Sequence, residues 1–287
     1  MIKQQVYTIA QLEKIANDIR KDIITMLEHA GSGHSAGPLD LADIFTALYF
    51  DILRHDPKNT LWEDRDVLVL SAGHCAPVMY AAMAHSGYFD KKELLTLRKF
   101  GSRLQGHPER LRLPGVESTS GPLGEGLGQA LGMALAIQLK HETHRWVYCV
   151  TGDGELNEGN IWESAMMAGK YKTSNLIAIV DRNNIQIDGT TEEVMPLENL
   201  KSKWESFGWH VQEVDGHNIE RIIDACSMAR AITEKPSVII AHTIPGKGVP
   251  FMEYDYHWHG APPNSEQAKE ALKKLRTLDG KIRGEHE

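Results

Sequence analysis

Residues 146–154 are WVYCVTGDG, an apolar run that ends in two glycines on either side of an aspartate. The run predicts a buried β-strand, because it is short, continuous and rich in β-branched and aromatic side chains. Gly152 and Gly154 would let the chain turn sharply after the strand and approach a ligand closely. We therefore expect Asp153 just beyond the carboxyl end of a strand, where open α/β sheets bind their ligands.

A second strand of the same kind is predicted at residues 176–180, and it is followed by the polar sequence DRNN at 181–184. If the two strands are parallel neighbours, Asp153 and Asn183 meet at one edge of the sheet. Carboxylate, amide and main-chain oxygens suit a hard cation such as Mg²⁺, which often shares phosphate oxygens with the protein. The two strand ends together predict a site for a cation and a phosphate group.

Strands and helices alternate along the chain, which predicts an α/β fold with a parallel sheet and helices on both faces. The first helix begins at Ile9 after a capping box of Thr8 and Gln11, and Gly31 ends it. Residues 104–123 are rich in Gly and Pro and predict a long functional loop. One diphosphate-binding domain is expected over residues 1–263, with a terminal helix and tail at 264–287. Strands are expected at 67–70, 146–150, 176–180, 209–214 and 238–241, and further helices at 39–53, 127–139, 162–171, 219–232 and 265–275.

Composition excludes several classes of protein. The 287 residues carry a formal charge of −8, which argues against a nucleic-acid partner. No apolar run approaches the length of about 20 residues that crosses a bilayer, and the N-terminus has no secretory signal. The three cysteines, Cys75, Cys149 and Cys226, form no disulfide or zinc pattern, so a cytoplasmic protein is expected. Cys75 is either a nucleophile beside His74 or a small packed residue, and we favour packing.

Several further motifs occur in the order that is typical of one family. They are Ser32-Gly33-His34, Ser71-Ala72-Gly73-His74, Gly106-His107-Pro108-Glu109, GPLGEG at 121–126 and His259-Gly260-Ala261-Pro262. With Asp153, Asn183 and Glu158, they resemble the signatures of transketolases from about Ile9 to Pro262. Transketolases are more than twice as long, and the chain resembles only their first, diphosphate-binding domain. The resemblance therefore implies the N-terminal subunit of a split transketolase.

The resemblance also implies a cofactor, thiamine diphosphate with Mg²⁺, for which Ca²⁺ or Mn²⁺ can substitute. It assigns the metal to Asp153, the Asn183 side chain and the Ile185 carbonyl. It assigns cofactor contacts to His74, Gly121, Leu123, Gly152, Gly154, Glu155, Asn183, Ile187 and His259. Residue type alone leaves alternatives open, since Asp153 could be a turn former and Leu123 and Ile187 could be core residues.

Fourteen histidines are present, and four of them lie in Gly-rich segments where the backbone can bring them to a ligand. By resemblance, His34, His107 and His259 are catalytic and bind substrate oxygens, while His74 and His259 contact the cofactor diphosphate. A near-neutral imidazole can donate, accept and move protons at physiological pH. The alternative, a transition-metal site, is disfavoured because no pair has the spacing of helical or short-loop ligands.

These motifs account for only half of the residues that form a transketolase active site. In the family, the activating glutamate, the aromatic residues around the aminopyrimidine and the sugar-phosphate site belong to the following domain. The resemblance thus implies an α2β2 heterotetramer with a C-terminal partner subunit. The pair would transfer a two-carbon ketol group from a ketose phosphate to an aldose phosphate, as in pentose phosphate metabolism. Alternatives are half of a 1-deoxyxylulose-5-phosphate synthase-like enzyme, a non-catalytic regulatory subunit, and a fragment of a longer chain.

The sequence departs from the family pattern at three places. Ser35-Ala36 replaces the usual Pro-Gly after the first histidine, and Asp40 stands where glycine is common. The segment 246–249, GKGV, is more like deoxyxylulose-phosphate synthases and archaeal-type transketolases, and Lys247 is either a cationic contact or a solvated loop lysine. These departures leave the donor and acceptor sugars open.

Overall fold

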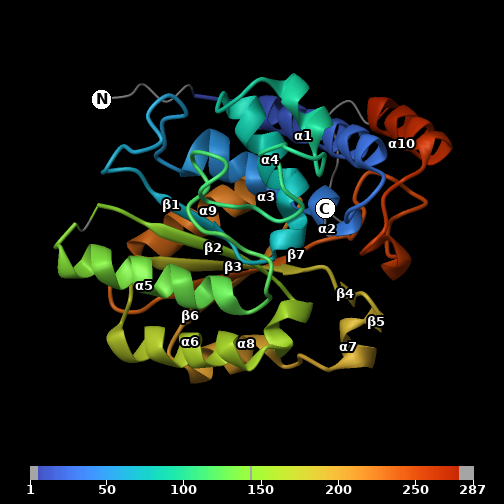
Figure 1. Ribbon diagram of the computed structural model, residues 1–287. Helices are drawn as coiled ribbons and strands as arrows, with labels where there is room; N and C mark the ends of the chain where they lie inside the picture. Colours follow the sequence, from blue (N-terminus) through green and yellow to red (C-terminus); the bar gives the residue numbers. More distant parts are fainter. Residues whose placement is uncertain (1–5, 143, 278–287) are drawn as a thin grey trace.

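The computed structural model describes residues 6–142 and 144–277. Its centre is one parallel sheet of five strands in the order β1-β2-β3-β7-β6 (Figure 1). The strands are β1 Val67–Leu70, β2 Val147–Gly152, β3 Leu176–Arg182, β6 His210–Asp215 and β7 Ser237–His242. All five predicted strands are present, and the predicted α/β class is confirmed.

Helices cover both faces of this sheet (Figure 1). One face packs against α1 Ile9–Ala30, α3 Ala42–Ala47, α4 Ala76–Ser86 and α9 Ile219–Ala231, and the other against α5 Glu125–Leu139, α6 Gly159–Tyr171 and α8 Leu200–Ser206. Alternate strand residues belong to the two layers: Tyr148 and Val150 face the first, while Val147 and Cys149 face the second. Burial on both faces explains why the strands are continuous apolar runs.

The N-terminal helix follows the prediction closely. Thr8 and Gln11 form the capping box, and Gly31 ends α1 with a left-handed φ of 65°. The C-terminal α10, Ser265–Thr277, packs against α1 (Figure 1). The predicted tail beyond it lies outside the described residues.

The predicted helix at 39–53 is wrong in its start and its regularity. The structure has α2 Ala36–Asp40, then α3, then a π-helical turn at Leu48–Ile52. Helix α2 includes Pro38, which is tolerated in a first turn because the N–H groups there have no helical partner. The apolar pattern gave no sign of the π turn, in which the Leu53 N–H bonds the Leu48 carbonyl at 2.8 Å.

Helix α4 was not predicted, and its burial explains why. Its first nine residues are all buried, so the polar stripe that marks an amphipathic helix is missing. The predicted loop at 104–123 contains no helix or strand. The remaining short elements are β4 Ile185–Gln186, β5 Gly189–Thr190, α7 Thr191–Val194 and 3₁₀ turns at Gly73–Cys75, Lys91–Thr96, Gly154–Asn157 and Tyr256–Trp258. Within the described residues, no helix has the length and apolarity to span a bilayer.

Candidate active site

A cavity of about 340 Å³ lies where the loops after β1, β2 and β3 meet. Every residue predicted for the site lines it: His34, His74, His107, Gly121, Leu123, Gly152, Asp153, Gly154, Glu155, Asn183, Ile185, Ile187 and His259. The lining also includes Ala72, Cys75, Asp181, Gln186 and Asp188, to which the sequence analysis gave no cofactor role. The fold thus brings together motifs that are up to 225 residues apart in the chain.

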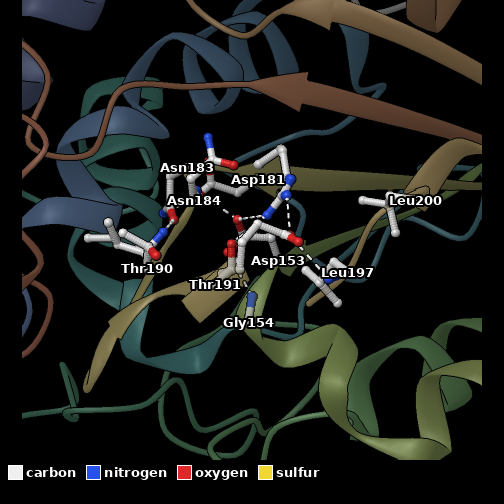
Figure 2. Close-up of polar contacts among 12 residues, drawn as sticks. Asp153, Gly154, Asp181, Asn183, Asn184, Thr190, Thr191, Leu197 and Leu200 are labelled. Atoms are coloured by element: carbon white, nitrogen blue, oxygen red, sulfur yellow. Dashed lines mark hydrogen bonds and ion pairs between the residues drawn. The ribbon is translucent and has the colours of Figure 1, made fainter. Parts of the chain in front are cut away.

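Asp153 lies just beyond β2 and is almost completely buried, with 1% of its surface exposed. Its Oδ1 accepts the Gly154 N–H at 2.7 Å, and its Oδ2 accepts the Asn184 N–H at 2.7 Å and Arg182 Nη1 at 3.0 Å. Figure 2 shows Asp153 beside Gly154 and Asn184. Burial raises the pKa of Asp153 to about 6, against the opposing effect of Arg182. Oδ1 accepts one hydrogen bond and keeps a lone pair for a cation.

Arg182 is the partner of Asp153 that the sequence analysis missed. It is buried and also donates to Thr191 Oγ1 at 2.7 Å, Glu192 Oε1 at 2.8 Å and Glu198 Oε1 at 3.0 Å. These bonds fix the carboxylate of Asp153 and tie α7 to the sheet edge. Arg182 lies in the DRNN sequence at the end of a buried strand. That position could have indicated that Arg182 pairs with a carboxylate at the sheet edge.

Asn183, Asp40 and Asp181 form a buried cluster close to Asp153. Asn183 Nδ2 donates to Asp40 Oδ2 at 3.1 Å and to Asp181 Oδ2 at 3.0 Å, while Asn183 Oδ1 accepts the Ile185 N–H at 3.1 Å. Burial and the charge of Asp181 raise the pKa of Asp40 well above its ordinary value. Burial likewise raises the pKa of Asp181 to about 7. Burial thus disfavours the charged form of both carboxyl groups.

Glu155 has a side chain that braces the loops around the cavity. Its Oε1 accepts the Gly124 N–H at 2.8 Å and the Ser71 hydroxyl, and its Oε2 accepts the Gly152 N–H at 3.0 Å. Burial raises the pKa of this carboxyl, while the hydrogen bond from Ser71 opposes that shift. These contacts were not predictable from the sequence, because those with Ser71 and Gly124 span 84 and 31 residues.

Of the two glycines in the GDG sequence, only Gly154 lacks space for a side chain, and neither adopts a conformation that is special to glycine. Neither Gly152 nor Gly154 has a positive φ, so the predicted sharp turn does not require glycine. A Cβ added at Gly154 would lie 3.1 Å from the Gln186 Cβ, which is closer than ordinary contact. Gly121 does require glycine, because its φ is 151° and it lies beside His107.

Three histidines form a cluster on another wall of the cavity. The ring centroids of His34 and His74 are 4.9 Å apart, those of His74 and His259 5.2 Å, and those of His34 and His259 5.8 Å. Burial, aided by the charge of His259, lowers the pKa of His34 to about 4, and it lowers the pKa of His74 and His259 as well. The rings are therefore neutral at pH 7. His107, whose pKa is also lowered by burial, lies at the exposed side of the cavity.

The burial of three side chains decides between alternatives that the sequence left open. Leu123 and Ile187 are 39% and 65% exposed, so the interpretation as core residues is wrong. Cys75 is buried, and burial raises the pKa of its thiol well above the ordinary value, which favours packing over a nucleophilic role. All three cysteines are free, as predicted.

Comparison with known proteins identifies the family. The family model described as transketolase, thiamine diphosphate binding domain, matches residues 11–280. The chain belongs to the transketolase family. It is 43% identical over 275 residues to the 6-deoxy-6-sulfo-D-fructose transketolase subunit SqwG of Clostridium sp., covering 96% of this chain and 98% of that protein. It is 40% identical to an apulose-4-phosphate transketolase subunit of Phocaeicola vulgatus, covering 93% of this chain and 94% of that protein.

Solved transketolases have the same fold over this length. The transketolase of Campylobacter jejuni matches with a TM-score of 0.87 and 37% identity, covering 95% of this chain and 43% of that one. A Pichia stipitis transketolase matches with a TM-score of 0.88 and 34% identity, and this chain spans 41% of its length. The chain is therefore the half of a split transketolase that carries the thiamine diphosphate-binding domain.

Proposed function

We propose that this chain binds thiamine diphosphate and Mg²⁺ and, with a second subunit, transfers a two-carbon ketol group from a ketose phosphate to an aldose phosphate. One observation carries the proposal. Thirteen residues chosen from the sequence, in motifs from His34 to His259, all line a single cavity at the carboxyl edge of the sheet. A subunit with only a scaffolding role would need neither the oxygen ligands nor the histidines to converge.

The donor set fits a hard cation. Asp153 Oδ1 and Asn183 Oδ1 each accept one hydrogen bond and keep a lone pair, and Ile185 lies beside them in the cavity lining. No three His, Cys, Asp or Glu side chains of the described chain are grouped to hold a metal ion. Amide and peptide oxygens therefore have to contribute, together with diphosphate oxygens, as is usual for Mg²⁺.

The residues on the other wall would act on the sugar. Thiamine diphosphate, when bound, supplies the electron sink that ketol transfer requires. Neutral imidazoles at His34, His107 and His259 can donate to a carbonyl oxygen or accept a hydroxyl proton near pH 7. Leu123 and Ile187, exposed beside the cavity, can cover the apolar face of a ring. His74 and the main chain at Gly121, Gly152, Gly154 and Glu155 would hold the cofactor.

A partner subunit would complete the site. It would bring the activating glutamate and the sugar-phosphate site, and two copies of each chain would form an α2β2 heterotetramer. Relatives of similar length act on a sulfonated fructose and on apulose 4-phosphate, by their names. We propose a substrate of the same kind, a ketose with an anionic group at the far end.

The test is ketol transfer with thiamine diphosphate and Mg²⁺, on this chain alone and with the protein that co-purifies with it from its host. The donors are xylulose 5-phosphate, 6-deoxy-6-sulfofructose and apulose 4-phosphate, and the acceptor of the ketol group is ribose 5-phosphate. Activity only in the mixture is expected. Activity of the chain alone would contradict the half-site. Absence of transfer with every donor, despite cofactor binding, would favour the regulatory alternative, and pyruvate-dependent release of carbon dioxide would favour the synthase-like one.

A further inference from the structure

We propose that Asp40 is a positioning residue that orients the Asn183 side chain so that its oxygen faces the cation. The proposal rests on the metal site proposed above. A side-chain amide has an oxygen and a nitrogen at the ends of a nearly symmetric group, and only the oxygen can ligate a metal. The hydrogen-bond partners of the nitrogen therefore decide whether Asn183 is a ligand.

Both hydrogens of this amide nitrogen have carboxyl acceptors. Asp40 Oδ2 lies 3.1 Å from Asn183 Nδ2, and Asp181 Oδ2 lies 3.0 Å from the same atom. Figure 2 shows Asp181 and Asn183 side by side at the strand end. Turning the amide around would lose both bonds and place its oxygen against two carboxyl oxygens. The pair of acceptors thus favours one orientation.

The position of Asp40 is consistent with orienting Asn183. It is not consistent with direct contact to a ligand in the cavity. It is the last residue of α2, it is completely buried, and it does not line the cavity. Its Oδ1 is buried without a hydrogen-bond partner among the described residues, while its Oδ2 accepts from Asn183. Burying a carboxyl group that is half satisfied is costly. A role in holding Asn183 accounts for a carboxyl group that stands where glycine is common.

Asp181 alone would give a weaker constraint. It can accept one of the two N–H groups, and Thr243 Oγ1 already donates to its other oxygen. Without Asp40, the second N–H of Asn183 would have no acceptor, and the amide could rotate away from the ligating position. Removal of such an outer partner typically weakens metal affinity about 10- to 100-fold.

The experiment measures Mn²⁺ affinity by electron paramagnetic resonance, in the full chain together with saturating thiamine diphosphate and the partner subunit. Asp40→Ala should weaken Mn²⁺ binding about 10- to 100-fold. Asp40→Asn, which keeps an acceptor oxygen in the same place, should restore affinity to within about threefold of the original chain. Thermal unfolding without metal checks that each variant is folded.

The same substitution in an Asn183→Asp variant distinguishes a role of Asp40 in orienting Asn183 from a general role in stabilising the fold. In Asn183→Asp the side chain has two equivalent oxygens, so there is no amide to orient. Asp40→Ala should then cause no further loss, because its role has disappeared. Equal losses in both backgrounds, unchanged affinity of Asp40→Ala, or a loss in Asp40→Asn as large as in Asp40→Ala would overturn the proposal. If the original chain binds no Mn²⁺, the metal site itself is wrong, and the positioning role fails with it.

Discussion

The two walls of the cavity are built in opposite ways. At the carboxylate wall, formed by Asp153, Asp181 and Asn183 with Arg182 behind them, each side-chain oxygen and nitrogen of the three lining residues has a hydrogen-bond partner within the protein. At the histidine wall, formed by His34, His74, His107 and His259, two ring nitrogens are buried and without partners in the described chain: the Nδ1 atoms of His34 and His259. The first wall is already organised, and the second has hydrogen-bonding capacity left for a ligand.

The difference follows from the backbone that carries each wall. Strands β2 and β3 pair in register up to Gly152 and Asp181, so Asp153 and Arg182 are placed by the hydrogen bonds of the sheet. His34 and His259 lie in loops at opposite ends of the chain. A metal diphosphate has to be held in one place throughout the reaction, whereas groups that handle substrate protons change partners. The arrangement suits a division between anchoring and chemistry.

Asp153→Ala should have the largest effect, because it removes a proposed metal ligand from the organised wall. We expect no measurable Mg²⁺-dependent binding of thiamine diphosphate, followed by calorimetric titration in the presence and absence of Mg²⁺. The buried Arg182 loses one partner but keeps Thr191, Glu192 and Glu198, so the fold should survive with reduced stability. Asp153→Asn is the control for packing. Unchanged cofactor affinity in Asp153→Ala would remove Asp153 from the metal site.

His107→Ala should distinguish the role of the histidine wall in the reaction from the role of the carboxylate wall in cofactor binding. The side chain is at the exposed side of the cavity, so its removal should leave thiamine diphosphate affinity within about twofold. The loss of a proton-transferring group should lower kcat by about 100-fold or more. His29→Ala, at an exposed histidine near the end of α1, is the matched control and should leave kcat unchanged. A fall in cofactor affinity as large as the fall in kcat would contradict the division between the walls.

The sequence was sufficient for the five strands of the main sheet, and the motifs of the family resemblance were sufficient for thirteen residues of the cavity lining, since each motif is local. A strand that ends in GDG, or a histidine among glycines, is visible within a short stretch of sequence. The supporting side chains were not predictable in this way. Asp40 contacts Asn183 across 143 residues, and Glu155 contacts Ser71 across 84, so their roles depend on the tertiary structure.

Burial also limited the prediction of helices. Helix α4 has no polar face in its first nine residues, and the region of α2 and α3 is buried throughout, so no periodic pattern marks their ends. His217 shows the same limit for polar groups. It is buried between Asp43, which its Nδ1 contacts at 2.9 Å, and the Ile244 N–H, which its Nε2 accepts at 2.8 Å. Both ring nitrogens are thus used in contacts within the fold, which the sequence around His217 does not reveal.

The two walls should respond to acid with opposite signs. The pKa of His34 is lowered to about 4, below its unfolded value of about 6.5, so the unfolded chain binds a proton first as the pH falls. Stability contributed by neutral His34 is therefore lost between about pH 6.5 and pH 4. Asp153 acts in the other direction, because its pKa is raised to about 6 and the folded chain binds a proton first.

Comparing the original chain with a variant that lacks the imidazole isolates the contribution of His34 to the pH dependence of stability. Urea unfolding of the original chain and of His34→Gln should be compared at about pH 7 and about pH 4.5, on either side of most of this titration. The free energy of unfolding of the original chain should fall by roughly 2 kcal/mol more than that of the variant. Parallel pH dependence of the two proteins would mean that His34 titrates normally and that its environment is more polar than the structure indicates.

The smallest effect is expected from a single methyl group at the organised wall. In Gly154→Ala, the new Cβ would lie 3.1 Å from the Gln186 Cβ, so the hairpin of β4 and β5 must shift by a few tenths of an ångström. We expect a loss of stability below about 1 kcal/mol and a several-fold loss of thiamine diphosphate affinity. Gly132→Ala in α5 is the control, since nothing lies within 4 Å of its Cβ, and it should raise stability by about 0.5–1 kcal/mol. Equal cofactor affinity in both variants would mean that the carboxylate wall tolerates displacement, and that its dense hydrogen bonding does not make it rigid.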